Sequence, residues 1–263
     1  MLIIVVAILV FYLGASFGSF YNVLIDRLPL SRDVISSRSI CESCNTKLNW
    51  IDLFPLFSFI ALGRKCRYCG IKLSFQYFIS ELSVGSLFLL SFCLWGQNLE
   101  YGMMIYHIVF WSMLFCVAVI DYKTGYIMDQ VLIVFTVSGL VVSFFLTDIA
   151  IVDSLLGGVV GFGCYGTLYG IVRLILKKEG FGSGDVMLLG AVGFFLGPTN
   201  TLITAVLSFY VSIPFILLKK VKCKRLGKHF EVPFGPAVCT TAFIISLFPT
   251  EIYQCILNML GFK

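Results

Sequence analysis

Two aspartates are the residues of this sequence best suited to hydrolytic chemistry. Asp185 follows the glycine-rich stretch Gly182-Ser183-Gly184 and opens an apolar run, and Asp121 stands at the end of another apolar run. An ionisable side chain at the edge of a membrane segment is a candidate for function by default. Two carboxylates in one site can share a single proton, so that one deprotonates a water while the other polarises a carbonyl. The pair predicts peptide hydrolysis without a covalent intermediate, with Asp121 and Asp185 as catalytic residues.

The glycines beside Asp185 support this interpretation. A backbone without side chains at Gly182 and Gly184 lets another helix or an extended peptide approach closely. A structural interpretation competes with it, because Asp185 precedes Val186 as an N-cap would. Capping is less natural for Asp121, because an anion at the C-terminus of a helix opposes the helix dipole. Asp129 stands where an N-cap belongs, and we interpret it as structural.

Four of the ten cysteines form two C-x-x-C pairs within one polar stretch, Cys41 with Cys44 and Cys66 with Cys69. Four thiolates arranged in this way suit a tetrahedral Zn²⁺, and nearby arginine and lysine residues favour the thiolate form. We therefore predict a structural zinc ion bound by these four side chains. Two labile redox pairs and four unligated cysteines are the alternatives. Four protein ligands would fill the metal shell, which argues against hydrolysis at the metal.

Glu81 is a further acidic residue near the start of an apolar run. It can pair with a basic residue of a substrate or with Arg27, and it can equally be a structural polar contact. The sequence does not separate these roles.

The elements that must position these residues are membrane helices. The chain has 263 residues, of which 59% are hydrophobic and only 13% charged, and its mean hydropathy is +0.98. This composition indicates a polytopic membrane protein. Gly14 and Gly18 in the first apolar run have the spacing that allows close helix packing. Runs that predict spans lie at about 1–25, 76–95, 103–120, 128–147, 151–176, 186–197, 199–218 and 235–249.

We therefore predict an all-α polytopic membrane protein with about eight transmembrane helices and a cytoplasmic zinc-binding loop domain. The sixth run covers only about 18 Å as a helix, and Gly197-Pro198 ends it with turn chemistry. This run is therefore expected to be re-entrant, tilted against its neighbours, or continuous with the loop that carries Asp185. The expected domains are a first transmembrane helix at 1–25, the zinc-knuckle loop at 26–75, and a membrane bundle at 76–263.

The basic residues fall almost entirely in alternate loops. All of the 19 except Lys263 lie at 27–72, Lys123, 173–178 or 219–228. The positive-inside rule puts these loops in the cytoplasm and both termini outside. Asp121 and Asp185 are then expected at the same, cytoplasmic face of the membrane.

The sequence resembles the bacterial type IV prepilin peptidases, the leader peptidase/N-methyltransferase family of GxGD aspartic proteases, along nearly its whole length. The resemblance rests on five stretches in order, which are Gly18 to Pro29, the two C-x-x-C pairs, Ile120 to Gly125, Gly182 to Asp185, and Val232 to Pro236. The family commonly has a proline where Met128 precedes Asp129, a departure that leaves the aspartate pair untouched.

The resemblance implies an inner-membrane enzyme. It implies that Asp121 and Asp185 are the catalytic aspartates and that leader peptides of type IV prepilins and pseudopilins, of pili and type II secretion, are cleaved after a glycine. It also implies that S-adenosylmethionine-dependent methylation of the new N-terminus follows and that the cysteine-bearing loop belongs to that activity. No residues are assigned to the methyl donor. The alternative function is a proton- or cation-coupled transporter or assembly factor whose zinc loop docks a partner.

Overall fold

The structure is a computed structural model of the whole chain. It describes all residues except 35–38, 42, 148, 177–181, 227–233 and 260–263. Some of the basic and motif residues discussed above lie outside the described residues, namely Arg38, Lys177, Lys178, Lys228, Val232, Pro233 and Lys263.

The chain is built from α-helices with short 3₁₀ turns, and the part that the structure describes contains only two isolated β-bridges. The helices are α1 Leu2–Arg27, α2 Phe57–Ala61, α3 Phe75–Leu94, α4 Tyr101–Thr124, α5 Asp129–Leu146, α6 Ile151–Leu176, α7 Ser183–Leu226, α8 Gly235–Leu247 and α9 Pro249–Met259. The 3₁₀ turns are η1 Leu28–Leu30, η2 Trp50–Leu53 and η3 Gly96–Asn98. The chain forms two compact units, Met1–Ile108 and Val109–Lys263. The helical content of the described residues confirms the predicted all-α class.

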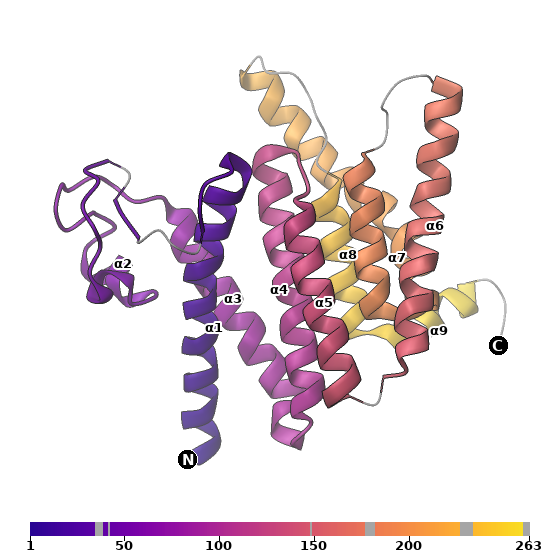
Figure 1. Cartoon of the computed structure of the whole chain (residues 1–263), viewed down its shortest axis with the longest axis horizontal. Helices are drawn as coiled ribbons and strands as arrows, with labels where there is room; N and C mark the ends of the chain where they lie inside the picture. Colours follow the sequence, from indigo (N-terminus) through magenta and orange to yellow (C-terminus); the bar gives the residue numbers. More distant parts are fainter. Residues whose placement is uncertain (35–38, 42, 148, 177–181, 227–233, 260–263) are drawn as a thin grey trace. The chain divides into compact units, whose positions relative to one another are not determined.

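The first unit is organised around the contact between α1 and α3 (Figure 1). A Cβ atom on Gly14 would lie 2.7 Å from the Cβ of Phe88, and one on Gly18 would lie 2.8 Å from the Cα of Glu81. Real Cβ atoms do not approach other atoms so closely, so these glycines are what lets the two backbones meet. The predicted packing role of Gly14 and Gly18 is confirmed.

In the second unit, α7 reverses direction at Gly197. That residue has φ 73° and ψ 174°, which interrupts the helix. The start of α7 lies beside α6, where Val186 faces Gly166, and the hydroxyl of Tyr165 donates to the carbonyl of Ala205 over 3.0 Å. Val186 and Ala205 would be about 28 Å apart in a straight helix, so the two arms of α7 must lie side by side.

Counted helix by helix, the described residues give fewer spans than the eight predicted runs, because α7 contains two of those runs. Among the described residues, six helices are long and apolar enough to cross a membrane, or seven if α8 and α9, which are bent by 99°, form one span. The prediction of about eight differs because it counted 186–197 and 199–218 separately, and both fall within α7. Gly197, the predicted break between them, is the residue at which α7 turns back.

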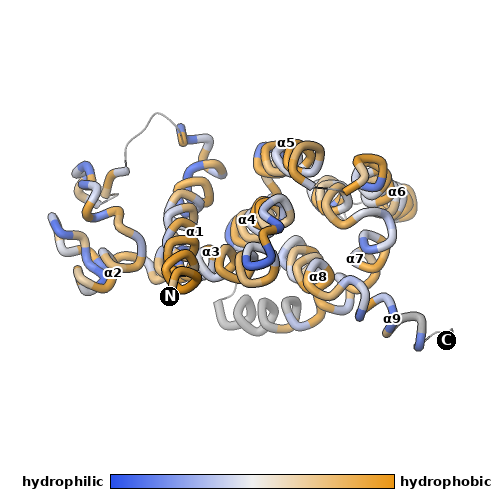
Figure 2. The backbone as a smooth tube through the Cα atoms, turned by 90° about the horizontal axis from the view of Figure 1, so that it is seen from below, coloured by the Kyte–Doolittle hydropathy of each residue, from blue (hydrophilic) through white to orange (hydrophobic). Residues whose placement is uncertain are grey.

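Apolar side chains cover the outside of the helices, as lipid contact requires. Figure 2 shows hydrophobic residues along most of α1, α5 and α6, and a mixture of hydrophilic and hydrophobic residues in the loop around α2. Large apolar side chains such as Phe145 on α5 and Leu174 on α6 are exposed. The chain is accordingly a multi-pass membrane protein.

Candidate active site and metal centre

Asp121 lies in the last turn of α4, and its side chain is only 4% exposed. Its Oδ2 accepts a hydrogen bond of 2.9 Å from the amide of Gly235, the first residue of α8. The first amides of a helix have no partner within the helix, and the N-terminus of a helix attracts an anion. Asp121 therefore caps α8, which offsets its unfavourable position at the end of its own helix.

Asp185 is the third residue of α7, so it lies in the first turn of the helix and is not the N-cap. Its amide donates to the carbonyl of Gly182 over 3.2 Å. A Cβ atom on Gly182 would lie 3.0 Å from the Asp185 Oδ2, and one on Gly184 would lie 3.1 Å from the Cβ of Ile127. The glycines thus leave room for the carboxylate on one side and for the α4–α5 connection on the other.

The two carboxylates lie near each other. Asp121 and Asp185 are close enough to interact electrostatically. The buried Cys239 of α8 lies within electrostatic range of both. The end of α4 and the starts of α7 and α8 therefore converge. Two acids in such a place can hold a water molecule and polarise a carbonyl group.

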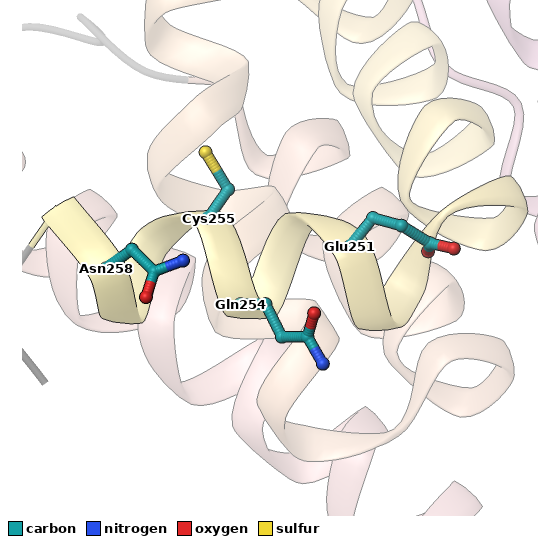
Figure 3. Close-up of a pocket in the computed structure, with 4 residues that line it drawn as sticks. All are labelled: Glu251, Gln254, Cys255 and Asn258. Atoms are coloured by element: carbon teal, nitrogen blue, oxygen red, sulfur yellow. The ribbon is translucent and has the colours of Figure 1, made fainter. Parts of the chain in front are cut away.

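An apolar hollow lies near Asp185. It is lined by residues of α6 and the second arm of α7, including Tyr165, Leu168, Val206 and Phe209. Tyr165 interacts electrostatically with Asp185. The described residues that line a second hollow all lie on α9, namely Glu251, Gln254, Cys255 and Asn258, and they include neither aspartate (Figure 3).

The four cysteines of the two C-x-x-C pairs come together in the first unit. Their sulfur atoms all lie within 4.8 Å of one another, and the sulfurs of Cys41 and Cys69 are 3.8 Å apart. Tetrahedral coordination with Zn–S bonds of about 2.3 Å puts sulfur atoms about 3.8 Å apart. The cluster therefore fits a tetrahedral metal ion with four sulfur ligands.

Both pairs have the same backbone geometry. The amide of Cys41 donates to Thr46 and its carbonyl accepts from Asn45, and the corresponding bonds at Cys66 involve Ile71 and Gly70. Asn45 and Gly70 have positive φ values of 53° and 71°, which asparagine and glycine adopt more readily than other residues. An Asn or Gly directly after C-x-x-C was therefore a sequence signal for this turn.

Hydrogen bonds shift the pKa values of the cysteine thiols. Those from the Thr46 side chain and backbone lower the pKa of Cys44 to about 6. Backbone hydrogen bonds at Cys69 and Tyr68 lower the pKa of Cys66. The backbone of Ile71 acts in the same direction on Cys69, but desolvation and hydrogen bonds to the other sulfurs raise the pKa of Cys69 to about 11. Lowered values at two of the four sulfurs favour the thiolate form that a metal needs.

Glu81 and Arg27 have different partners. The Oε2 of Glu81 accepts a hydrogen bond of 2.7 Å from the amide of Leu56, and the carboxylate also contacts the Ser19 side chain. Arg27 donates through Nη1 to the carbonyl of Asp33. This geometry favours the structural role for Glu81 over a pair with Arg27.

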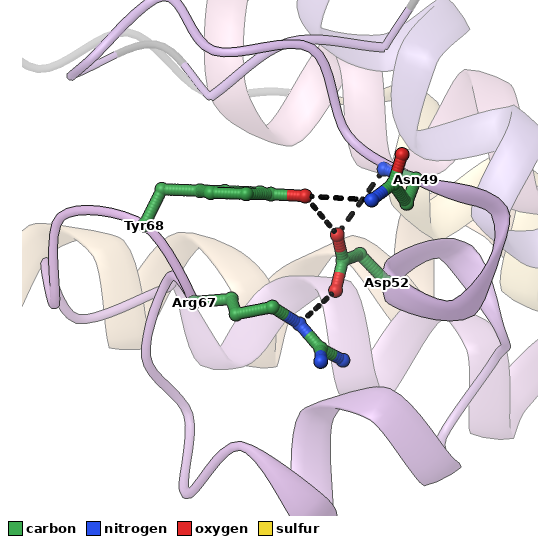
Figure 4. Close-up of polar contacts among 4 residues, drawn as sticks. All are labelled: Asn49, Asp52, Arg67 and Tyr68. Atoms are coloured by element: carbon green, nitrogen blue, oxygen red, sulfur yellow. Dashed lines mark hydrogen bonds and ion pairs between the residues drawn. The ribbon is translucent and has the colours of Figure 1, made fainter.

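Sequence reasoning missed Asp52. Its side chain is 5% exposed and pairs with Arg67 Nε over 2.7 Å (Figure 4). Its other oxygen accepts from the Tyr68 hydroxyl and from the Asn49 amide, both over 3.1 Å. Arg67 and Tyr68 are the residues between Cys66 and Cys69, so Asp52 holds the second cysteine pair. The one sequence signal for Asp52 was that an acidic residue stands alone among apolar residues.

Comparison with known proteins agrees with the geometry. Residues 12–95 match the Bacterial Peptidase A24 N-terminal domain, and residues 108–217 match the Type IV leader peptidase family. A prepilin leader peptidase/N-methyltransferase of Klebsiella pneumoniae is 31% identical over 193 residues, which cover 71% of this chain and 83% of that protein. The protein of the same name from Bacillus subtilis is 31% identical over 258 residues, which cover 95% of this chain and 98% of that protein.

No solved structure is significantly similar to the chain. The sequence matches do not support the alternative of a transporter or assembly factor. The chain belongs to the type IV leader peptidase family.

Proposed function

We propose that this chain is a membrane aspartic endopeptidase that removes the leader peptides of type IV prepilins or pseudopilins and methylates the new N-terminal residue. The observation that carries the peptidase proposal is the pair of interacting carboxylates of Asp121 and Asp185 at converging helix ends. Family membership and the names of the relatives support the substrate class and the second activity.

In the proposed reaction, the ionised member of the aspartate pair takes a proton from a water molecule. The protonated member donates a hydrogen bond to the scissile carbonyl, and the water oxygen attacks its carbon. The proton then passes to the leaving amine, so the peptide bond breaks without a bond to the enzyme. Gly182 leaves the room that the Asp185 carboxylate occupies. The apolar hollow beside Tyr165 is suited to the apolar part of such a substrate.

The four cysteines are proposed to bind a structural Zn²⁺. The sulfur spacing and the saturated set of four ligands support zinc held for structure rather than for hydrolysis. We expect this ion to contribute to the folding of a loop whose apolar core is small. S-adenosylmethionine would supply the methyl group, and no residues are assigned to it.

The proposed location is the bacterial inner membrane, with the aspartates at the cytoplasmic face. The one-sided distribution of basic residues supports this orientation. A prepilin has a basic leader in the cytoplasm and then an apolar helix, so its scissile bond lies at the inner interface. The proposed parts remain the first helix at 1–25, the methyltransferase-associated loop at 26–75, and the peptidase bundle at 76–263.

The test is to incubate the purified full chain with a prepilin in detergent, with and without S-adenosylmethionine, and to follow the substrate by mass spectrometry. We expect loss of the leader in both reactions and addition of one methyl group only with the donor. A substrate that keeps its leader under both conditions would contradict the proposed peptidase. Leader loss without methylation would contradict the second activity alone.

A further inference from the structure

The segment Trp50–Ala61, between the two cysteine pairs, carries an apolar surface that no described residue covers. Its side chains of Trp50, Phe57 and Ile60 are 78%, 62% and 67% exposed. An exposed group of large apolar side chains marks a surface that contacts something apolar. The segment was predicted to be part of a cytoplasmic loop, where such exposure would be unfavourable.

This segment lies alongside α1. Figure 1 shows α2 beside α1 and not beyond the C-terminal end of that helix. The ring of Phe54 is 6.1 Å from the ring of Tyr12, and Tyr12 lies about 22 Å along the helix axis from Arg27. Tyr12 is in the middle of a long apolar helix that qualifies as a membrane span. Phe54 thus reaches the part of α1 that lies within the bilayer.

Contacts with α3 place the segment beside that helix as well. Phe59 stacks on Phe78 with ring centroids 5.2 Å apart, and the amide of Leu56 donates to Glu81. Glu81 is about 9 Å along α3 from its first residue, Phe75. The guanidinium of Arg64, which follows the segment, lies 5.6 Å from the centre of the Phe75 ring. The chain therefore descends beside both helices and returns to the start of α3.

Several backbone amides of the segment have hydrogen-bond partners within the protein, as a lipid environment requires. The amides of Ser58, Ile60 and Leu62 donate to backbone carbonyls, and Leu56 donates to Glu81. Asp52 is the one charged residue between Asn49 and Gly63. Its carboxylate pairs with Arg67 and accepts hydrogen bonds from Tyr68 and Asn49, as Figure 4 shows.

We propose that Trp50–Ala61 inserts into the bilayer beside α1 and α3, with Trp50, Phe57 and Ile60 against lipid acyl chains. The occupant is lipid because the exposed surface continues the lipid-facing side of α1 at Tyr12, which is itself 42% exposed. The cysteine cluster is thereby tied to the membrane through a short segment on either side.

The test is fluorescence quenching in vesicles that contain the full chain. The difference in emission between the wild-type protein and Trp50→Phe isolates Trp50 from Trp95 and Trp111. We expect lipids brominated on the acyl chains to remove most of this emission, and aqueous iodide to leave it unchanged. Trp50→Phe is a mild change because the side chain is mostly exposed.

Two further variants support the measurement. Phe57→Trp in the Trp50→Phe background puts the reporter on α2, and the same quenching by brominated lipid is expected. Ile71→Trp in that background puts it on the second cysteine pair and provides the aqueous reference. Quenching of Trp50 and of the Phe57→Trp reporter by iodide would overturn the inference, because the segment would lie in water. Quenching by neither agent would also overturn it, because protein would then cover the segment.

Discussion

Asp121 illustrates how a side chain can be held by a helix other than its own. The sequence made a capping role unnatural for it, because an anion opposes the dipole at the end of α4. The structure gives it the first amide of α8 as a partner. The contact joins residues that are 114 positions apart, so no local pattern could predict it. A carboxylate fixed in this way is oriented before substrate arrives.

Gly235→Ala tests this orientation. A Cβ atom at this position would lie 2.5 Å from the Asp121 Oδ2, so the carboxylate must move. Misplacement of a reacting group by about 1 Å can lower a rate by about 10²-fold, and we expect a loss of that order in leader cleavage. The control is Gly163→Ala, because nothing lies within 4 Å of that Cβ position. Equal rates for the two variants would contradict the positioning role of Gly235.

Cys44 and Cys69 are expected to differ in reactivity once metal is removed. A pKa of about 6 leaves Cys44 mostly as thiolate at pH 7, whereas a pKa of about 11 keeps Cys69 protonated. In protein treated with a chelator, Cys44 should therefore be alkylated first by iodoacetamide, as measured by peptide mass spectrometry. Its rate should fall as the pH decreases through about 6, because the thiolate takes up a proton. Faster alkylation of Cys69 at pH 7 would contradict this prediction.

At the scale of elements, the sequence predicted most of the helices and the break at Gly197. The predicted run 151–176 coincides with α6, and Gly197 interrupts α7 as expected. The reversal at Gly197 could not be predicted, because hydropathy marks a segment as apolar without giving its direction. The depth of Trp50–Ala61 was missed for a related reason, since a short apolar run inside a polar loop has no periodicity to place it.

The paired cysteine turns make a prediction of their own. Four sulfur atoms with tetrahedral spacing should bind one zinc ion per chain, which metal analysis of the purified protein can measure. Cys41→Ser should lose the ion, because three ligands remain. Cys255→Ser, which changes an exposed cysteine of α9, is the matched control and should keep it. Metal-free wild-type protein after purification with zinc present would contradict the prediction.

At the scale of the whole molecule, alternating charge and hydropathy predicted a multi-pass protein with both aspartates at one face. The second unit brings Asp121 and Asp185 together because α4 ends where α7 begins. The stretch that contains Gly235 was marked by the resemblance, but its contact with Asp121 and the place of Cys239 emerged only from the structure, because they depend on contacts between distant parts of the chain. The orientation of the protein in the membrane remains a prediction.

The most direct test of the central claim is leader cleavage by Asp121→Asn and Asp185→Asn, with Asp129→Asn as the control. Asparagine keeps the shape of the side chain but cannot act as an acid or a base, and Asp129 is an exposed residue at the start of α5. We expect both aspartate variants to insert and fold. We expect each to cleave prepilin about 10²-fold to 10⁴-fold more slowly than the control, or not at all. Cleavage at the control's rate by either folded variant would contradict the account.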